Sequence, residues 1–355
     1  MKSDAGFAGR VIGWQREHGR HTLPWQDTRD PYRVWLSEIM LQQTQVSTVM
    51  GYYERFLRRF PDVHSLATAA LDDVFGLWSG LGYYSRARNL HRCAQAVVEQ
   101  HGGVFPASSA ALQTLPGIGR STAAAIAAFC FGERVAILDG NVKRVLARLL
   151  AFDGDLAQAR NERMLWEHAT ALLPESSIES YTQGLMDLGA TICLPRAPLC
   201  LLCPVRDLCA AAASGTQERF PVKTRKLKRS VRESVWLEAR WRGRVWLVQR
   251  GASGIWAGLW SLPEFESLDA LHGATRAWPG RSEALAAFKH VLTHLDWHLQ
   301  PVRWTFPERT PASRTETCLA PWPEGRWFTL EEALALGLPA PLRKRLEAAE
   351  TAAAA

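Results

Sequence analysis

Glu38 and Asp139 are carboxylic acids whose sequence contexts favour different protonation states. On a helix, the residues three positions before and after Glu38 share its face, and they are Trp35 and Leu41 rather than charged partners. This pattern indicates that Glu38 lies in an apolar pocket. Burial raises the pKa of a carboxyl group, so we expect Glu38 to hold a proton near neutral pH. Asp139 stands at the start of another helix with Lys143 in the first turn, and both features favour its ionised form. Such a pair can act as a general acid and an electrostatic stabiliser.

Both carboxyl groups also have an ordinary structural interpretation. Glu38 would then lie on the solvated face of a surface helix. Asp139 would only cap its helix, which is a common use of aspartate at that position. The neighbouring motifs favour the chemical interpretation.

A Pro-Gly-x-Gly turn precedes Asp139 in the sequence, in the run from Leu115 to Gly119. Gly117 and Gly119 allow a tight hairpin between two helices, the second beginning near Ser121. The free amide groups of such a turn and helix start form an anion site that fits a phosphate. The small residues of the following helix let a neighbour pack closely, as in a helix-hairpin-helix unit. We therefore expect this turn to bind a nucleic-acid backbone, although such turns are often only connectors.

Four cysteines follow in a C-x6-C-x2-C-x5-C spacing: Cys193, Cys200, Cys203 and Cys209. In a chain without a visible signal peptide, such a cluster indicates a metal site rather than disulfides. Structural zinc more often uses two C-x2-C pairs, and four thiolates also suit an iron–sulfur cluster, which we favour. The loop within this cluster carries Arg196, a cation that could meet DNA. The other cysteines, at positions 93, 130 and 318, are expected to be core thiols.

A glycine-rich loop at residues 79–86 carries Leu81 and Tyr83, which we expect to be exposed at its tip. Apolar side chains on a loop beside a DNA-binding turn are candidate wedges for a base step. The alternative is that both side chains pack into the core.

The elements that must position these groups are mainly helical before residue 210 and mixed after residue 233. We expect one helix to run from Pro31 to Val46, with further helices near residues 4–20, 46–58, 65–69, 72–78, 85–101, 121–131, 141–151, 157–173 and 178–190. After residue 233 we expect a hairpin at residues 234–250, strands near 289–304 and 314–320, and helices near 281–287, 330–335 and 340–348.

The length of 355 residues and a net charge of +7 indicate at least two domains and favour a polyanionic partner. Residues 219–232 contain seven Lys or Arg and no acid, which indicates a basic linker along a phosphate backbone or simply a solvated linker. The sequence has no apolar run long enough to span a bilayer, so we expect a cytosolic, nucleoid-associated protein without a membrane partner.

These motifs together resemble those of one family. The first ~225 residues are similar to the endonuclease III superfamily of DNA glycosylases, and the whole chain resembles the MutY-type adenine DNA glycosylases. The motifs that carry the resemblance are Leu36–Thr44, Gly80–Tyr84, Leu115–Gly119, Leu138–Asn141 and the four-cysteine spacing.

The resemblance implies a mainly α N-terminal helix-hairpin-helix glycosylase domain with an iron–sulfur cluster loop, and an α+β Nudix-like C-terminal domain. We place these domains at residues 1–213 and 233–348, with a basic linker at 214–232 and a disordered tail at 349–355. It also implies a 4Fe–4S cofactor and a duplex DNA substrate in which adenine lies opposite 8-oxoguanine or guanine. The Nudix catalytic box is missing from residues 233–345, so we expect no nucleotide hydrolysis.

The resemblance also implies roles for individual residues. It assigns catalysis to Glu38 and Asp139, because an N-glycosidic bond breaks through a cationic sugar and needs one acid and one anion. It places Trp25, Gln26, Leu41, Val46, Gln183 and Met186 around the adenine, and Gln43, Thr44, Leu81, Tyr83, Thr293 and His294 around the 8-oxoguanine. It gives DNA-backbone contacts to Gly117, Gly119, Ser121, Lys143 and Arg196, and metal ligation to the four cysteines.

Three positions depart from the family pattern. Ser121 stands where relatives that also cleave the strand carry a Lys, and a hydroxyl cannot form a Schiff base, so we expect a monofunctional glycosylase. Gln26 replaces an Arg of many relatives, and Leu292 replaces a Phe before Thr293 and His294. Two rival interpretations are a bifunctional glycosylase for oxidised pyrimidines and a non-enzymatic iron–sulfur DNA-binding protein. We expect a monomer.

Overall fold

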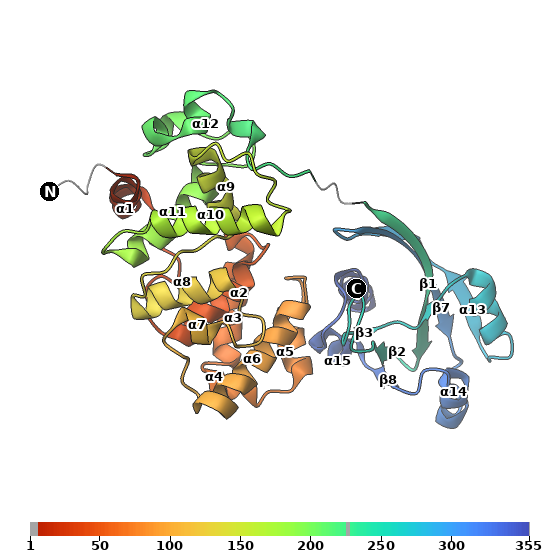
Figure 1. Cartoon of the computed structure of the whole chain (residues 1–355). Coiled ribbons are helices and arrows are strands. Elements are labelled where there is room, and N and C mark those ends of the chain that lie inside the picture. Colours follow the sequence, from red (N-terminus) through yellow and green to blue (C-terminus); the bar gives the residue numbers. More distant parts are fainter. Residues whose placement is uncertain (1–5, 225–227, 355) are drawn as a thin grey trace. The chain divides into compact units, whose positions relative to one another are not determined.

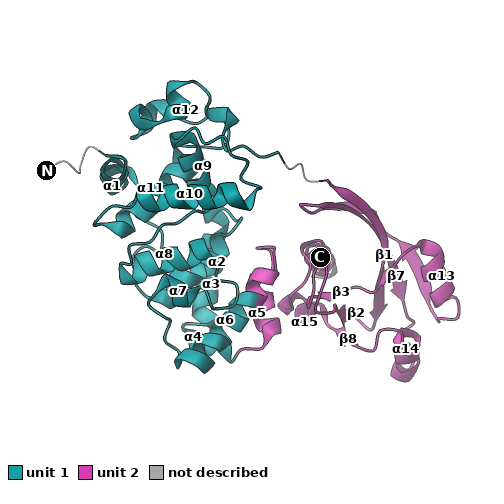
Figure 2. Ribbon diagram, in the orientation of Figure 1, with its two compact units in different colours: residues 1–68, 89–226 teal, residues 69–88, 227–355 magenta. Residues whose placement is uncertain are grey.

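The computed structural model describes residues 6–224 and 228–354, which form two compact units (Figures 1 and 2). The first comprises residues up to Thr68 and from Asn89 to the linker, and the second comprises residues 69–88 together with the chain after the linker. Residues 225–227 of the predicted basic linker lie outside the described residues. Among the described residues, no helix is both long and apolar enough to cross a bilayer.

The first unit is helical, and its core gathers side chains from α1, α8, α9, α10 and α11, including Val11, Leu146, Leu165 and Leu185. Its helices are α1 (Phe7–His18), α2 (Pro31–Leu41), α3 (Val46–Arg59), α4 (Val63–Ala67), α6 (Ser85–His101, whose first turn belongs to the second unit), α7 (Ser109–Leu112), α8 (Arg120–Phe131), α9 (Gly140–Leu149), α10 (Ala159–Ala171), α11 (Ile178–Thr191) and α12 (Ala210–Ala213). Short 3-10 turns lie at Cys200–Leu202, Arg206–Leu208 and Gln217–Arg219.

Helix α2 is shorter than we expected from the sequence. Asp30 caps it by accepting the Tyr32 amide at 2.9 Å, but it ends at Leu41 instead of continuing to Val46. The chain breaks at residues 42–45, where Gln43 adopts a left-handed φ of 57°. No glycine or proline marks this break, so local sequence signals could not reveal it.

The predicted turn before α8 is a glycine hairpin whose shape excludes larger residues. Gly117 has a φ of 78°, and a Cβ atom there would lie 2.6 Å from the Cβ atom of Asn89. Gly119 is the N-cap of α8 and offers no side chain to bond the first amides of that helix. These exposed amides are therefore free to meet an anion.

The second unit is a mixed sheet with helices on both faces (Figure 1). Its strands are β1 (Ser230–Trp241), β2 (Arg244–Gln249), β3 (Trp260–Ser261), β4 (Glu264–Phe265), β5 (Arg281–Ala284), β6 (Phe288–Val291), β7 (Leu295–Thr305) and β8 (Gly325–Phe328). The central order is β3-β2-β1-β7-β5, and β1 and β7 run parallel. Its helices are α5 (Leu71–Trp78), α13 (Leu268–Thr275), α14 (Ala312–Leu319), α15 (Leu330–Ala335) and α16 (Ala340–Ala354).

From Ser234 onward, strand β1 is buried on both faces, as expected of a central strand. Trp236 contributes to a core with Leu342 and Leu346 of α16, whereas Leu237 contributes to a second core with Leu271 of α13. The side chains of consecutive β1 residues therefore serve opposite faces of the sheet.

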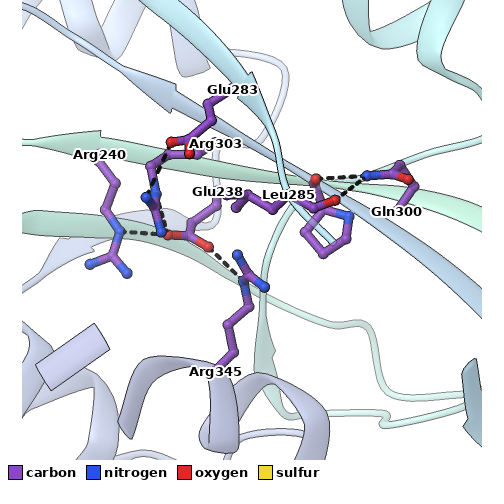
Figure 3. A network of polar contacts seen from close by, with 8 residues as sticks. Glu238, Arg240, Glu283, Leu285, Gln300, Arg303 and Arg345 are labelled. Carbon is purple, nitrogen blue, oxygen red and sulfur yellow. Dashed lines mark hydrogen bonds and ion pairs between the residues drawn. The ribbon is translucent and has the colours of Figure 1, made fainter. Parts of the chain in front are cut away.

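A buried carboxylate attaches α16 to this sheet (Figure 3). Glu238 of β1 is fully buried and binds Arg240 at 3.0 Å, Arg303 of β7 at 3.0 Å and Arg345 of α16 at 2.7 Å. Burial alone would raise the pKa of Glu238, but the charges of the three guanidinium groups outweigh it and lower that pKa. Breaking such a buried pair is costly, so these contacts hold the helix in place.

Several elements of the second unit differ from the sequence predictions. Residues 281–284 form strand β5, because they pair with Val302–Thr305 of β7, and are not a helix. The strand expected at 314–320 is helix α14, and α13 and β8 were not predicted. Helix α16 continues through Ala354, where we expected a disordered tail after residue 349. The predicted hairpin at 234–250 is present, with positive φ angles at Arg242 and Gly243.

Residues 69–88 pack within the second unit although they lie far from it in sequence. Asp72 accepts the indole N–H of Trp260 at 3.1 Å, and the Tyr84 hydroxyl donates to the Leu338 carbonyl at 2.8 Å. Gly76 lies so close to α15 that a Cβ atom there would be 2.3 Å from the Ala335 carbonyl oxygen. The loop predicted to wedge into DNA is thus part of the same body as the C-terminal sheet.

Candidate active site

The first unit contains a cavity of about 1320 Å³ that both predicted catalytic carboxyl groups line. Glu38 reaches it from α2, and Asp139 reaches it from the N-terminus of α9. The residues that the family resemblance placed around the adenine also line this cavity: Trp25, Gln26, Leu41, Val46, Gln183 and Met186. Segments that are far apart in the sequence therefore line the same cavity as the two carboxyl groups that were predicted to be catalytic.

Glu38 has the environment that we expected from its apolar neighbours. The side chains of Trp35, Leu36 and Ile39 beside it are buried, so the carboxyl group faces the cavity rather than bulk water. Burial, together with the negative charge of Asp139, raises the pKa of Glu38 to about 7. A carboxyl group with this pKa is suited to donate a proton near neutral pH.

Asp139 is the N-cap of α9 and accepts the Val142 amide at 2.8 Å. We expected its surroundings to favour the ionised form, but burial raises the pKa of Asp139 and outweighs that effect. The amides of Val142 and Asn141 and the charges of Arg144 and Lys143 act in the opposite direction and favour the anion. No amide donor lowers the pKa of Glu38, and the charge of Asp139 raises it. When the two groups share one proton, the helix N-terminus therefore keeps the negative charge on Asp139.

The backbone before Asp139 is held by Ser121, the residue that replaces a lysine. The Ser121 hydroxyl accepts the Leu138 amide at 3.1 Å, which joins the start of α8 to the residue preceding the carboxylate. Lys143 does not remain free for a phosphate, because its ammonium group binds Glu162 at 2.6 Å. The lysine was evident from the sequence, but its pairing with Glu162 was not.

Arg144 joins the start of α9 to the cysteine loop. Its guanidinium donates to Asn141 Oδ1 at 2.9 Å, to the Gly189 carbonyl at 2.6 Å and to the Cys193 carbonyl at 2.7 Å. The helix that presents Asp139 is thereby fixed to the first cysteine of the cluster motif.

The four cysteines line a small apolar cavity of about 30 Å³ together with Val145, Leu149 and Leu188. Four thiols around one apolar cavity are a donor set that suits an iron–sulfur cluster. Within residues 6–224 and 228–354, no group of three or more His, Cys, Asp or Glu side chains is arranged to hold a single metal ion. Of the remaining cysteines, Cys93 and Cys318 are buried and Cys130 is partly buried.

No sequence pattern singled out Arg148, which holds the cysteine loop through hydrogen bonds to its backbone. Only 2% of this residue is exposed, and its guanidinium donates to the Leu194 carbonyl at 2.7 Å, the Gln217 carbonyl at 2.9 Å and Cys193 Sγ at 3.3 Å. The only sign of it in the sequence was an arginine at a position of α9 where the helical period predicts an apolar residue. Arg196, which we expected to face DNA, is exposed on this loop.

The predicted wedge loop lies in the second unit and differs from expectation at one position. Leu81 is only 6% exposed, because it packs inward, whereas Tyr83 is 47% exposed. The hydroxyl oxygen of Tyr83 lies 3.2 Å from that of Thr293, in the turn between β6 and β7. His294 is exposed beside Thr293.

The guanidinium of Arg86 donates to the carbonyls of Leu81 at 3.2 Å and Gly82 at 3.3 Å and so fixes the shape of this loop. The residues predicted to contact 8-oxoguanine therefore belong to both units of the chain. Gln43 and Thr44 line the cavity of the first unit, and the other four belong to the second unit.

Comparison with known proteins matches both units to families. Residues 36–169 match the HhH-GPD superfamily of base excision DNA repair proteins, and residues 235–348 match the NUDIX domain. The fold class expected from the sequence, a helical helix-hairpin-helix domain followed by a Nudix-like domain, is confirmed by these matches.

Curated relatives cover nearly the whole chain. The adenine DNA glycosylase of Buchnera aphidicola subsp. Baizongia pistaciae (strain Bp) is 35% identical over 349 residues and covers 95% of each chain. The adenine DNA glycosylase of Homo sapiens is 33% identical over 392 residues, covering 92% of this chain and 70% of the human protein.

Solved structures match the helical unit. A thermostable thymine-DNA glycosylase superposes with a TM-score of 0.54 at 30% identity, covering 59% of this chain and 95% of that one. A non-covalent endonuclease III–DNA complex superposes with a TM-score of 0.51 at 19% identity, covering 59% and 95% respectively, which shows a shared fold.

Proposed function

Because this chain belongs to the adenine DNA glycosylase family of the HhH-GPD superfamily, we propose that it hydrolyses the N-glycosidic bond of adenine paired with 8-oxoguanine or guanine in duplex DNA. The observation that carries the proposal is the shared cavity of Glu38 and Asp139, in which the pKa of Glu38 rises to about 7. The family is one of DNA repair enzymes, so the partner is DNA.

Glu38 is the general acid in the proposed mechanism. Adenine is a poor leaving group unless it is protonated, and a neutral Glu38 donates its proton to N7 of the base. The resulting carboxylate then removes a proton from the attacking water, which balances the proton donated in the first step. The raised pKa keeps Glu38 in its active, protonated form close to neutral pH.

Asp139 stabilises the positive charge that develops on the sugar as the base leaves. Its negative charge is fixed by the Val142 amide and by the position of the carboxylate at the start of α9. A preorganised charge in a cavity contributes more than the same charge in water, because no solvent has to reorganise during the reaction.

The target adenine must leave the DNA stack to reach these groups, which costs a few kcal/mol and is offset by contacts with the cavity. We assign these contacts to Trp25, Gln26, Leu41, Val46, Gln183 and Met186, all of which line the cavity. The edge-to-face contact of Trp25 with Tyr53 fixes the indole in that wall.

We assign recognition of the opposite base to both units. Tyr83, Thr293 and His294 present exposed polar or aromatic groups in the second unit. In the first unit, the exposed Gln43 and the half-buried Thr44 line the cavity. Leu81 supports the loop from inside rather than acting as an exposed wedge.

The phosphate backbone is held by the amides of Gly117, Gly119 and Ser121 at the hairpin and by Arg196 on the cysteine loop. Lys223 of the linker also lines the catalytic cavity and adds a cation there. Lys143 contributes to DNA binding only when its ion pair with Glu162 opens, which weakens the original assignment.

We assign a 4Fe–4S cluster to Cys193, Cys200, Cys203 and Cys209, because four thiols that share an apolar cavity fit this group. A bound cluster would cross-link the loop and supply a one-electron redox couple. Purified protein should therefore be brown and contain iron; colourless protein with one zinc would overturn the assignment.

Single-turnover release of adenine tests the proposed function. Duplexes with adenine opposite 8-oxoguanine, guanine or thymine should rank in that order. Glu38→Gln should slow release by at least about a hundredfold while duplex binding survives, since general acid catalysis contributes about 10² to 10⁴. Rates within a few-fold of wild type would contradict the role of Glu38. Efficient borohydride trapping on DNA would instead favour the bifunctional alternative, because only an amine forms a Schiff base.

A further inference from the structure

Asp187 is a fully buried carboxylate on α11 that the proposed mechanism does not use. Arg20 supplies three donors to it: the backbone amide at 2.9 Å, Nε at 2.7 Å and Nη2 at 2.6 Å. One turn earlier on α11, Gln183 donates its side-chain NH2 group to Asp187 Oδ1 at 2.8 Å. In all four contacts the partner donates and the carboxylate of Asp187 accepts. Asp187 therefore acts only as an acceptor here.

This arrangement fixes the orientation of the Gln183 amide. A glutamine side chain has one donor end and one acceptor end, and only the NH2 end can face a carboxylate. The carbonyl oxygen of Gln183 accepts no hydrogen bond from any described residue, and the side chain lines the catalytic cavity. The cavity therefore receives an acceptor from Gln183 rather than a donor.

We propose that Asp187 is a positioning residue that sets selectivity for adenine by holding the carbonyl oxygen of Gln183 toward the base. The inference rests on the proposed function, because it needs adenine in this cavity. The 6-amino group of adenine donates to that oxygen. Hypoxanthine has an oxygen at the same position, so two acceptors would face each other and one buried polar group would stay unpaired.

A purely structural role for Asp187 is the rival explanation. In that case Asp187 would only attach α11 to the segment after α1 through Arg20, and its loss would weaken all substrates alike. The two roles differ in the ratio of adenine release to hypoxanthine release, which a general loss of stability leaves unchanged.

Asp187→Leu is the direct test. The Oδ1 atom of Asp187 accepts both the Arg20 guanidinium and the Gln183 NH2 group, so an asparagine oxygen in its place would still hold the Gln183 amide. Leucine removes this acceptor, so the Gln183 amide is free to present its NH2 end to the cavity. We expect the adenine-to-hypoxanthine ratio of single-turnover rates, measured opposite 8-oxoguanine, to fall at least about tenfold relative to wild type.

Arg20→Lys is the matched control, because it weakens the ion pair but leaves a carboxylate to hold the Gln183 amide. In this variant the rates of adenine and hypoxanthine release should change by the same factor. Gln183→Leu provides a second test that does not depend on the folding of the Asp187 variant. It removes the acceptor, so it should lower the same ratio, and adding Asp187→Leu should lower it no further.

The outcomes separate the inference from the proposed function. Wild-type protein that releases no adenine would refute the proposed function itself. Wild-type protein that releases adenine, together with an unchanged ratio in Asp187→Leu or in Gln183→Leu, would overturn the role of Asp187 alone.

Discussion

The negative charge of Asp139 helps to keep Glu38 protonated across the cavity that the two residues share. In the proposed mechanism, Asp139 therefore serves two purposes: it keeps Glu38 protonated, and it stabilises the cationic sugar that forms when the protonated base leaves. Two carboxyl groups with raised pKa values in one cavity titrate as a pair.

The rate of adenine release should depend on pH through Glu38. Because the pKa of this group rises to about 7, the acid is present below that pH and is lost above it, so the single-turnover rate should fall about tenfold per unit in the alkaline limb. The measurement is a pH profile with a normal adenine substrate. A profile that stays flat from pH 6 to pH 9 would argue against proton donation by Glu38.

Glu38 should also reduce the stability of the folded protein at neutral pH. Its pKa is higher in the folded state than the ordinary value of 4.5, so the unfolded state loses its proton first and stability falls as pH rises from about 4.5 to about 7. Glu38→Gln removes this cost and should raise the free energy of unfolding by up to about 3 kcal/mol at pH 8, with little change at pH 4. Denaturant unfolding at both pH values measures this difference, and an equal effect at both would contradict it.

Arg148 should be essential for the cysteine loop. Replacing it by Ala leaves the carbonyls of Leu194 and Gln217 without their donor in a buried site, and we expect a loss of about 3 kcal/mol or more in stability together with lower iron content. Thermal unfolding and iron analysis provide the measurement.

Arg196→Ala is the matched control on the same loop, because this arginine is exposed. It should keep stability and iron, while reducing the salt dependence of DNA binding by about one unit of slope. Equal loss of iron in both variants would remove the special role assigned to Arg148.

Tyr83 and Thr293 should act together in choosing the base opposite adenine. Tyr83→Phe and Thr293→Val each remove one hydroxyl of the 3.2 Å contact, and each should reduce the preference for 8-oxoguanine over guanine. The double variant should lose less than the sum, by roughly 0.5–1.5 kcal/mol, the net value of one hydrogen bond. Strictly additive effects would show that the contact plays no part in the choice.

Truncation after residue 225 should do more than remove the C-terminal sheet. Adenine release should persist, because the catalytic cavity belongs to the first unit, but the preference for 8-oxoguanine should weaken. Residues 69–88 lose Trp260 and Leu338 as partners, so we expect fast amide exchange in this segment. An unchanged preference would mean that the second unit does not read the opposite base.

The sequence was most informative where a residue contradicted its neighbours. Glu38 stood out as a charge among apolar residues, and Asp139 was marked by the glycine and helix start around it. Asp187 and Arg148 could not be identified in this way, because their partners, Arg20 and the carbonyls of the cysteine loop, are distant in sequence.

Secondary structure was missed for similar reasons. The pairing of β5 with β7 depends on tertiary contacts, which override local preference. The end of α2 at Leu41 is marked by no glycine or proline. The hairpin at Arg242 and Gly243 was predictable, because its turn chemistry is local.

Two separate stretches of the chain form the second unit: residues 69–88 and the residues after the linker. A chimera made with a single crossover would therefore carry an incomplete second unit, with the sheet taken from one parent and the loop that carries Tyr83 from the other. Under the proposed role of the second unit, an exchange of lesion preference between homologues therefore has to move both segments.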